Sequence, residues 1–351
     1  MKMKIQLDRR SLGIGEPPYV IAEIGSNHNG DMQLCKRLVD AAITCGADAV
    51  KFQSWTKETL ISKTEFRHGA SYVGKDRQLT SLEEELERFQ LTEEMHHQAS
   101  GYCREKGMTF FSSCLTPDEV DLLDSLDVPA FKIPSGEINN LRLLEYVAVK
   151  GRPVILSTGM ATLGEVEKAV SILRSAGNNE LALLHCISLY PPEYRNINLR
   201  NIATLQQAFQ VPVGFSDHSI GTAIPLAAIA LGACIIEKHF TLDKQMKGWD
   251  HAVSADPAEL ETIVREGRNI YEALGSAERI VDDQEMTKRR QMRRSLVLKR
   301  DLEAGHILGE ADIDFKRPGS GIRPDELEYA LGKRLARDMQ TDDIITWSDL
   351  E

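Results

Sequence analysis

The stretch VPVGFSDHSIGTAIPLAAIALGACIIEKHF, from Val211 to Phe240, decides the fold. It opens and closes on short apolar runs, Val211–Asp217 and Cys234–Phe240, and the segment Thr222–Leu231 between them has the composition of a helix. Neither run alternates between apolar and polar residues, which is typical of strands that are covered on both faces in a parallel sheet. The stretch therefore predicts one strand–helix–strand unit of such a sheet.

Six more runs of the same kind precede this unit. They are Tyr19–Gly25, Ala49–Ser54, Thr109–Cys114, Phe131–Gly136, Pro153–Gly159 and Leu181–Cys186. Helical stretches separate and follow the strands, at Met32–Cys45, Thr92–Lys106, Pro117–Leu126, Leu141–Val149, Gly164–Ser175, Leu199–Phe209 and Pro257–Leu274. Eight strand–helix pairs over the 257 residues Tyr19–Gly275 predict a (β/α)8 TIM barrel, an α/β fold of about 250 residues. A doubly wound sheet is the alternative, but the first strand ends in EIGSNHNG and lacks the expected G-x-G-x-x-G turn.

The chain outside the eight pairs shows three further segments. Trp55–Leu91 is a long excursion between the second and third strands, placed to cover the barrel mouth. After a barrel domain at 1–275, residues 276–294 are charged, include KRRQMRR, and predict a linker or exposed helix rather than a nucleic-acid patch. Residues 295–351 carry short alternating runs and turn signals, which predict a small β-rich domain.

Composition excludes several classes of protein. The formal net charge of -11 over 351 residues argues against nucleic-acid partners and a polybasic membrane binder. No apolar run approaches the roughly 18 residues that span a bilayer, and the first residues lack the apolar core of a signal peptide. The six cysteines form no C-x-x-C and are expected to be buried free thiols in a reducing compartment, so we expect a cytoplasmic protein.

Polar side chains lie at the carboxyl ends of all eight predicted strands, where a barrel of this kind carries its active site. Charged residues inside apolar runs are costly to bury unless they are paired or functional, and packing alone does not account for so many. In chain order, the polar residues at the predicted strand ends are Glu23, Asn27, His28, Lys51, Gln53, Ser112, Ser113, Lys132, Ser135, Glu137, Ser157, Thr158, His185, Ser188, Tyr190, Asp217, His218, Glu237, Lys238 and His239, followed by Asp250 and His251.

Two combinations of these residues suggest chemistry. His218 and His239 end neighbouring strands and could hold one divalent cation, unless each imidazole merely bonds a backbone carbonyl. Lys51 and Lys132, with Ser135 and Ser157, could cradle a phosphate. Either lysine could instead form a Schiff base, as in class I aldolases, or an ion pair with Glu23 or Glu137 inside the barrel.

Other candidates are given structural interpretations. His96 and His97, on a predicted helix, are expected to face solvent rather than bind a ligand. Cys114, Cys186 and Cys234 are interpreted as small core residues rather than nucleophiles.

At these residues the chain resembles the sialic acid synthase family. The motifs are IAEIGSNHNGD, DAVKFQSW, FKIPSGEINN, ILSTGMAT, LLHCISLYP, GFSDHSIG, IEKHFTLD and GWDHAVSADP. The closing SLVLKRDLEAGHIL and FKRPGSGI resemble the family's antifreeze-like (SAF, β-clip) domain. The resemblance runs in order over nearly the whole chain. It implies a barrel followed by that domain, in a domain-swapped homodimer.

The resemblance also implies a reaction. Phosphoenolpyruvate would condense with an open-chain N-acetylated aminohexose and water, which gives phosphate and a nine-carbon 2-keto-3-deoxy sugar acid of the N-acetylneuraminate type. His218 and His239 would hold Mn²⁺ or Mg²⁺ against the sugar aldehyde, and Glu23 would act on the sugar and the attacking water. Phosphoenolpyruvate would be bound by Lys51, Lys132, Ser135 and Ser157, with Ser112 or Ser113. The sugar or the metal-bound waters would be contacted by Gln53, Glu137, Ser188, Tyr190 and Asp250, and Arg317 would reach the sugar from the partner subunit.

Three departures from the family's pattern leave the sugar open. Ser188 stands where many bacterial relatives have Asn, and MKGWDHAVSADP differs from the usual G-P-D-H-x-x-S-x-E-P. The excursion Trp55–Leu91 matches no familiar form. A 2,4-diacetamido-trideoxyhexose, which would give legionaminic or pseudaminic acid, is therefore an alternative to N-acetylmannosamine, and retention of Asp250–His251 leans away from pseudaminate. A carbohydrate- or ice-binding protein without catalysis would lack the histidine pair and the lysines, and both are present.

Overall fold

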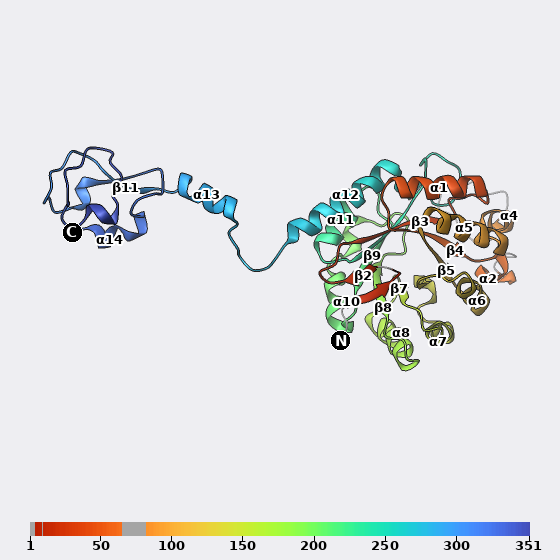
Figure 1. The fold of residues 1–351 in the computed structure, drawn as a ribbon. Coiled ribbons are helices and arrows are strands. Elements are labelled where there is room, and N and C mark those ends of the chain that lie inside the picture. Colours follow the sequence, from red (N-terminus) through yellow and green to blue (C-terminus); the bar gives the residue numbers. More distant parts are fainter. Residues whose placement is uncertain (1–3, 9, 65–81) are drawn as a thin grey trace. The chain divides into compact units, whose positions relative to one another are not determined.

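Eight parallel strands close into a barrel in this computed structural model, which describes residues 4–8, 10–64 and 82–351. Around the barrel, β10 pairs with β3 and the others follow in chain order. Figure 1 shows the barrel with helices around it. The strands are β3 (Tyr19–Gly25), β4 (Ala49–Ser54), β5 (Thr109–Cys114), β6 (Phe131–Ile133), β7 (Val154–Ser157), β8 (Leu181–Cys186), β9 (Val213–Asp217) and β10 (Ile235–His239). The predicted (β/α)8 barrel is confirmed.

Helices cover the outside of this barrel. They are α1 (Met32–Thr44), α5 (Glu93–Lys106), α6 (Pro117–Ser125), α7 (Leu141–Ala148), α8 (Leu163–Ser175), α10 (Asn201–Phe209), α11 (Ala223–Ala230) and α12 (Pro257–Leu274). Two of them, α5 and α11, begin one residue after the predicted start because the first residue of the pattern is the N-cap. Ahead of α5, the Thr92 hydroxyl accepts from the Met95 amide. Strand β6 is shorter than predicted, since Pro134 ends it and Ser135–Glu137 forms a 3-10 turn.

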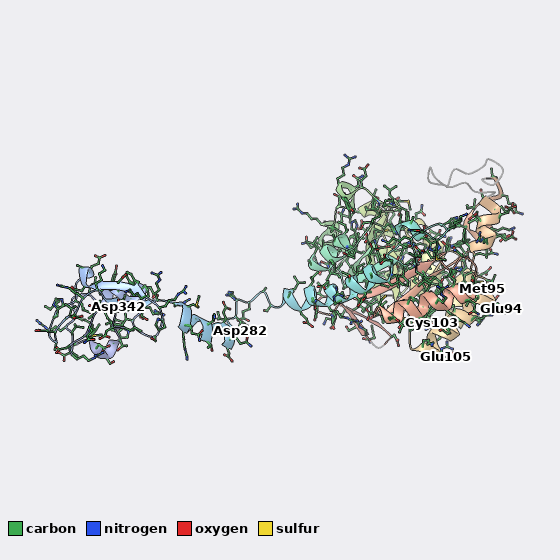
Figure 2. All side chains as sticks on the ribbon, turned by 90° about the horizontal axis from the view of Figure 1, so that it is seen from above. Glu94, Met95, Cys103, Glu105, Asp282 and Asp342 are labelled. Atoms are coloured by element: carbon green, nitrogen blue, oxygen red, sulfur yellow. The ribbon has the colours of Figure 1, made fainter. Side chains whose placement is uncertain are left out.

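The helix α5 corrects one prediction. His96 is buried rather than solvent-facing: its Nε2 lies 2.6 Å from the Ser54 hydroxyl and its Nδ1 lies 2.8 Å from the Thr92 carbonyl. Cys103 is buried on the same helix, whereas Glu94 and Glu105 are exposed (Figure 2). His97 is exposed, as expected. The two adjacent histidines therefore occupy opposite environments, and only His97 lies on the solvated face.

An N-terminal hairpin, which was not predicted from the sequence, closes the barrel at the amino ends of its strands. β1 (Lys4–Leu7) pairs antiparallel with β2 (Arg10–Gly13). Its apolar residues Ile5, Leu7 and Leu12 join the cluster that fills the barrel interior, together with strand residues such as Phe111 and Ile155. Because apolar side chains fill the barrel at the amino ends of the strands, this part of its interior is a packed core rather than a channel.

The excursion after β4 is described in part. It contains the short helix α2 (Lys57–Leu60) and the helix α4 (Leu82–Phe89), and residues 65–81 of the predicted excursion lie outside the described residues. Trp55, Leu86 and Phe89 form a small apolar cluster here, with Leu60, Leu115 and Trp249 packed against it.

The chain divides into two compact units, Met1–Gly275 and Ser276–Glu351. The second unit contains α13 (Asp283–Met292), the antiparallel pair β11 (Ser295–Leu298) and β12 (Ile313–Lys316), and the one-turn α14 (Leu327–Ala330). Its own apolar core includes Leu296, Ile313 and Ile345. A small β-rich C-terminal domain is thus confirmed, and the exact limits 276–294 for the linker stay a prediction. Among the described helices, none is both long and apolar enough to cross a bilayer.

Candidate active site at the barrel mouth

A cavity of about 420 Å³ lies at the carboxyl ends of the barrel strands. Eleven of the fifteen predicted site residues line it: Glu23, Lys51, Gln53, Ser113, Lys132, Ser135, Ser157, Ser188, Tyr190, His218 and His239. They come from β3 to β10 and the loops that follow these strands. The closed parallel barrel thus gathers residues from more than two hundred positions of sequence into one site.

Buried charges form the floor of the cavity. Lys51 Nζ lies 2.8 Å from Glu23 Oε2 and 4.0 Å from Glu237 Oε2. Lys132 Nζ lies 3.9 Å from Glu237 Oε1 and donates to the Ser157 hydroxyl at 2.7 Å. Each of these charged side chains is at most 7% exposed. Burial of four charged groups is tolerable because each has an opposite partner within reach.

The two carboxylates of this floor titrate in opposite directions. Burial raises the pKa of Glu23 to about 7, and the attraction of Lys51 only partly offsets it. Burial also disfavours charge on Glu237, but Lys132 and Lys51 outweigh it and lower the pKa of that carboxyl. Two carboxyl groups whose environments separate their pKa values are suited to different roles, one ionised and one able to exchange a proton near neutral pH.

The two lysines differ in the same way. Burial opposes the charge of both ammonium groups. For Lys51 the carboxylates of Glu23 and Glu237 outweigh burial and raise its pKa, whereas for Lys132 burial dominates and lowers its pKa. The Lys51 hydrogen-bond partner Ser113 lies 3.4 Å away and completes a positively charged cradle with Ser135 and Ser157. Such a cradle suits a phosphate or carboxylate group.

His218 and His239 lie side by side, with ring centroids 5.5 Å apart. His218 Nδ1 lies 2.8 Å from the Ile187 carbonyl oxygen and donates to it, which leaves Nε2 with a free lone pair. His239 Nδ1 is buried without a hydrogen bond, although Asp250 Oδ2 lies 3.5 Å away. Tyr190 stacks on His218 with centroids 3.9 Å apart and meets His239 edge-on.

This donor set fits a divalent cation bound by two imidazoles. A backbone carbonyl that fixes the tautomer of a histidine, and a carboxylate close to its neighbour, are common surroundings of metal-binding histidines. The orphaned nitrogen of His239 is a buried group that lacks the partner a metal or substrate would supply. No set of three or more His, Cys, Asp or Glu side chains in the described part of the chain is arranged to hold a metal. Two histidines would therefore leave the remaining positions to water and substrate.

One side of the cavity is apolar. We call it the tryptophan wall, and it consists of Trp55, Leu60, Leu115 and Trp249. The indole rings of Trp55 and Trp249 stack with centroids 5.7 Å apart and an interplanar angle of 14°. Trp249 belongs to the segment MKGWDHAVSADP, which departs from the family's pattern, and its place in the site was not predicted from the sequence.

Four predicted site residues do not line this cavity. Ser112 points to the opposite face of β5 from Ser113 and accepts a hydrogen bond from Ser54 at 2.6 Å. Glu137 accepts from the Asn140 side chain, and Asp250 lies beside His239. Arg317 belongs to the second unit. Of the two serines, Ser113 is therefore the one placed to contact a ligand.

The structure also adds residues that were not among the predicted site residues. Glu237, Ser216 and Cys186 line the cavity, and the Ser216 hydroxyl donates to Glu237 Oε1 at 3.0 Å. Glu237 and Ser216 each lie two residues before a site histidine, so they share its face of the strand. The two-residue alternation of side chains along a strand was the sequence signal that could have identified Glu237 and Ser216. Cys186 is buried, as expected of a core residue, but it also faces the cavity.

Two of the polar strand ends have a structural role instead. Lys238 Nζ lies 2.8 Å from Asp217 Oδ2, and both side chains are almost fully buried. The Asp217 carboxylate also accepts from the Ser219 amide at 2.8 Å. This ion pair ties β9 to β10 and explains why two charges sit inside apolar strands.

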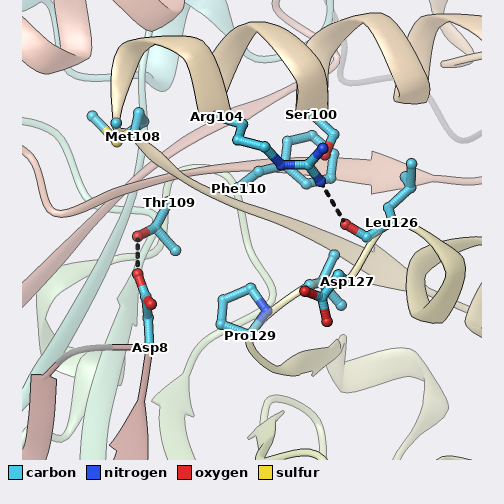
Figure 3. Close-up of a pocket in the computed structure, with 11 residues that line it drawn as sticks. Asp8, Ser100, Arg104, Met108, Thr109, Phe110, Leu126, Asp127 and Pro129 are labelled. Carbon is cyan, nitrogen blue, oxygen red and sulfur yellow. Dashed lines mark hydrogen bonds between the residues drawn. The ribbon is translucent and has the colours of Figure 1, made fainter.

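A separate hollow of about 380 Å³ lies at the other end of the barrel, before β5 and β6 (Figure 3). There Arg104 donates to the Leu126 carbonyl at 3.3 Å, and the Thr109 hydroxyl donates to Asp8 at 3.5 Å. The described residues that line it include none of the predicted site residues. The barrel mouth is therefore the candidate active site.

A closed barrel whose mouth combines a lysine–serine cradle with a histidine pair defines a class of enzyme that acts on small anionic substrates. Comparison with known proteins makes this specific. Residues 38–279 match the model of the NeuB family, and residues 293–351 match the SAF domain. The chain belongs to the NeuB family, which confirms the resemblance found in the sequence.

Individual relatives agree with this assignment. The chain is 41% identical to an N,N'-diacetyllegionaminic acid synthase of Legionella pneumophila, over 95% of this chain and 94% of that protein. It is 34% identical to the human N-acetylneuraminate-9-phosphate synthase, over 96% of this chain and 93% of that protein. A crystal structure of an N-acetylneuraminic acid synthetase from Leptospira borgpetersenii is similar, with a TM-score of 0.72 and 34% identity over 82% of this chain and 95% of that one.

Proposed function

We propose that the protein condenses phosphoenolpyruvate with an N-acetylated aminohexose and water to give a nine-carbon 2-keto-3-deoxy sugar acid and phosphate. The observation that carries this proposal is the juxtaposition of the lysine–serine cradle with the histidine pair in one cavity. The named relatives are synthases of such sugar acids, and the family membership supports the same reaction type here. The product would serve the biosynthesis of surface polysaccharides.

The cradle would hold phosphoenolpyruvate. Lys51, Lys132, Ser113, Ser135 and Ser157 supply two cations and three hydroxyls, which suit its phosphate and carboxylate groups. The Ser135 hydroxyl already accepts from the Gly159 amide at 2.9 Å, so its position is fixed before the substrate arrives. Preformed donors need no reorganisation when the substrate binds.

His218 and His239 would hold a Mn²⁺ or Mg²⁺ ion, which would polarise the sugar aldehyde when bound. In the condensation, C3 of phosphoenolpyruvate bonds to the aldehyde carbon, water adds to C2, and phosphate leaves with cleavage of its C–O bond. The water loses one proton as it adds to C2 and its second as phosphate leaves and C2 becomes a ketone. One of these protons goes to the aldehyde oxygen and the other leaves with the phosphate. Glu23 is the group best suited to exchange these protons, because its pKa is about 7 and its Oε1 is oriented by a hydrogen bond from Gln53 at 2.9 Å.

The identity of the sugar is tested by offering the protein phosphoenolpyruvate, Mn²⁺ and a panel of aminohexoses, and by measuring phosphate release. N-acetylmannosamine would give N-acetylneuraminate. A 2,4-diacetamido-trideoxyhexose would give legionaminic or pseudaminic acid, and the relative from Legionella pneumophila favours the legionaminic branch. Sugar-dependent release of phosphate is the expected result, and a protein that releases none with any of the panel would overturn the proposal.

A Schiff-base aldolase is the second candidate function. It would need a neutral amine, and the carboxylate of Glu23 at 2.8 Å keeps Lys51 charged. Lys132 has the lowered pKa that such chemistry requires. Borohydride reduction in the presence of pyruvate separates the two functions: we expect no covalent adduct, and an adduct on either lysine would favour the aldolase.

We also propose a domain-swapped homodimer in the cytoplasm, in which Arg317 of the second unit contacts the sugar in the partner's barrel. The match to the SAF domain over 293–351 and the free, buried state of all six cysteines support these proposals.

A further inference from the structure

The buried ion pair of Asp217 with Lys238 lies next to the histidine pair in the sequence. Asp217 directly precedes His218, and Lys238 directly precedes His239. The two charged residues are also direct partners across β9 and β10. Successive residues of a strand point to opposite faces, and neither charged residue is among those that line the cavity. The connection from the ion pair to the imidazoles therefore runs through the backbone.

The same ion pair closes the turn that follows β9. The Asp217 carboxylate accepts from the Ser219 amide at 2.8 Å. Lys238 Nζ donates to Asp217 Oδ2 at 2.8 Å and also to the Ser219 carbonyl oxygen. Both backbone polar groups of Ser219 are thus bound by one ion pair, and His218 is the residue enclosed between Asp217 and Ser219. We call Asp217, Ser219 and Lys238 the clamp.

His218 needs this support because strand pairing does not reach it. β9 ends at Asp217, and its register with β10 ends at the pair of Asp217 with Lys238. His239, by contrast, lies inside β10. The Ile187 carbonyl accepts from the imidazole of His218 and orients its ring, but it does not fix the backbone that carries the ring. The separation of the two imidazoles therefore depends on the clamp.

The clamp is better suited to fix geometry than to add stability. The side chain of Lys238 is 1% exposed and that of Asp217 is fully buried. Removing two charges from water largely cancels their attraction, so apolar side chains can often replace such a pair without loss of stability. An apolar pair cannot supply the two directed bonds to Ser219. The hydroxyl of Ser219 is buried without a hydrogen bond, so the clamp holds this residue by its backbone alone.

We propose that the clamp sets the separation of His218 and His239 for a divalent cation, which makes Asp217 and Lys238 positioning residues of the enzyme. This inference rests on the cation site of the proposed function and names the groups that set its geometry. No set of three His, Cys, Asp or Glu side chains in the described part of the chain is arranged to hold a metal, so a displaced imidazole would have no protein ligand to replace it. A clamp formed before the cation arrives avoids the cost of ordering the loop on binding.

A neutral replacement of the ion pair separates positioning from stability. The double change Asp217→Asn and Lys238→Met leaves no unpaired buried charge and removes the bond from Lys238 to the Ser219 carbonyl. We expect its urea midpoint to stay near that of the wild type, because the pair adds little net stability. Its Kd for Mn²⁺, measured by titration calorimetry, should nevertheless rise by about 10-fold or more. Its Kd for phosphoenolpyruvate, measured without metal, should be unchanged, because the bonds within the lysine–serine cradle remain.

Ser219→Ala is the matched control. It removes only the hydroxyl that takes no part in the clamp, so it should bind Mn²⁺ as the wild type does. A folded double variant with the Mn²⁺ affinity of the wild type would overturn the positioning role, and so would an equal loss of affinity for Mn²⁺ and phosphoenolpyruvate. A wild type that binds no Mn²⁺ would overturn the cation site of the proposed function and the inference with it.

Hydrogen exchange in the wild type gives a readout that needs no variant. The Ser219 amide donates to Asp217, so we expect it to be protected from exchange in the metal-free protein. Addition of Mn²⁺ should increase this protection little. An amide that exchanges freely until Mn²⁺ is added would mean that the cation orders the loop, and this result would contradict the inference.

Discussion

Glu23 and Glu237 show how position decides the behaviour of identical side chains. Both are buried in the barrel and both face Lys51, but Glu237 has Lys132 as well and also accepts from Ser216. The additional cation and hydrogen bond hold Glu237 ionised, and Glu23 is left as the carboxyl that protonates near pH 7. The floor of the site therefore contains one fixed negative charge and one exchangeable proton.

The raised pKa of Glu23 predicts a pH-dependent stability. Its pKa rises from 4.5 to about 7 on folding, so the native state holds a proton that the unfolded chain has already lost between these values. The free energy of unfolding should fall as pH rises through this window, by up to roughly 3 kcal/mol. Glu23→Gln cannot ionise, so its stability should not fall in this way. Between pH 5 and pH 8 the urea midpoint of the variant should therefore rise relative to that of the wild type. An equal change in both proteins would contradict the assignment.

Removal of either site histidine should abolish metal-dependent activity. In His218→Ala or His239→Ala the cation would keep a single imidazole, and we expect Mn²⁺ affinity and phosphate release to fall by more than about 100-fold. Titration calorimetry with Mn²⁺ and a phosphate assay measure the two effects separately. His97→Ala, an exposed histidine outside the cavity, is the matched control. Normal activity in either site variant would refute the metal assignment.

For individual residues, the sequence predicted the site where the carboxyl ends of the strands could be recognised. Alternation along a strand brings residues two apart to one face, which places Ser216 with His218 and Glu237 with His239. The environment of His96 was not predictable, because its burial depends on the Ser54 hydroxyl of a strand more than forty residues away. The ion pair of Asp217 with Lys238 likewise joins two strands, so only the folded barrel distinguishes it from the residues that line the cavity.

The loops after the strands are the elements that position the cradle. Gly159 follows β7, and its amide donates to the Ser135 hydroxyl beyond β6. A Cβ at Gly159 would lie 2.4 Å from the Ser188 hydroxyl and 2.7 Å from the Ser135 hydroxyl. Both serines line the cavity, so the close packing of these loops depends on the absence of a side chain here.

Gly159→Ala should therefore weaken phosphoenolpyruvate binding. The new methyl group would displace Ser135 and Ser188, and we expect KM for phosphoenolpyruvate to rise by about 10-fold, the cost of one lost hydrogen bond to a charged group. Steady-state phosphate release at saturating sugar measures it. Gly164→Ala in the next helix, where a Cβ would meet nothing within 4 Å, is the control. An unchanged KM in Gly159→Ala would remove Ser135 from the cradle.

The order and positions of the barrel strands were predicted well, but several apolar runs extend beyond the strand that they contain: the run Pro153–Gly159 contains β7, which covers only Val154–Ser157. The hairpin β1–β2 was missed because each of its strands has four residues, too few for a period of two to stand out. Strand β6 was overestimated because Pro134 continues the apolar run while it ends the ladder.

At the scale of the whole molecule, the two units each have their own core. If Arg317 completes the sugar site of a partner subunit, the barrel alone should bind phosphoenolpyruvate but use the sugar poorly. The isolated segment Met1–Gly275 should release phosphate far more slowly than the full chain, and light scattering should show the full chain as a dimer. A fully active segment would contradict the domain-swapped arrangement.

Arg317→Ala tests the same arrangement without truncation. We expect it to leave the barrel folded, as judged by circular dichroism, and to raise KM for the sugar by about 10-fold or more, since a hydrogen bond from a charged group is lost. Arg337→Ala, a change at another arginine of the second unit, is a control for its general stability. Equal sugar use by the Arg317 variant and the wild type would remove this residue from the site.

The hairpin β1–β2, at the amino ends of the barrel strands, has a consequence for how such an enzyme diversifies. It completes an apolar plug with Phe111 and Ile155, each of which lies two residues before a cavity-lining serine of the same strand. The buried apolar side chains of the barrel lie in this plug and in the layer beneath the helices, whereas the candidate site is lined from the strand ends and the loops that follow them. Lineages can therefore exchange mouth residues with little penalty in foldability, and a laboratory library confined to those loops should retain a high fraction of folded members.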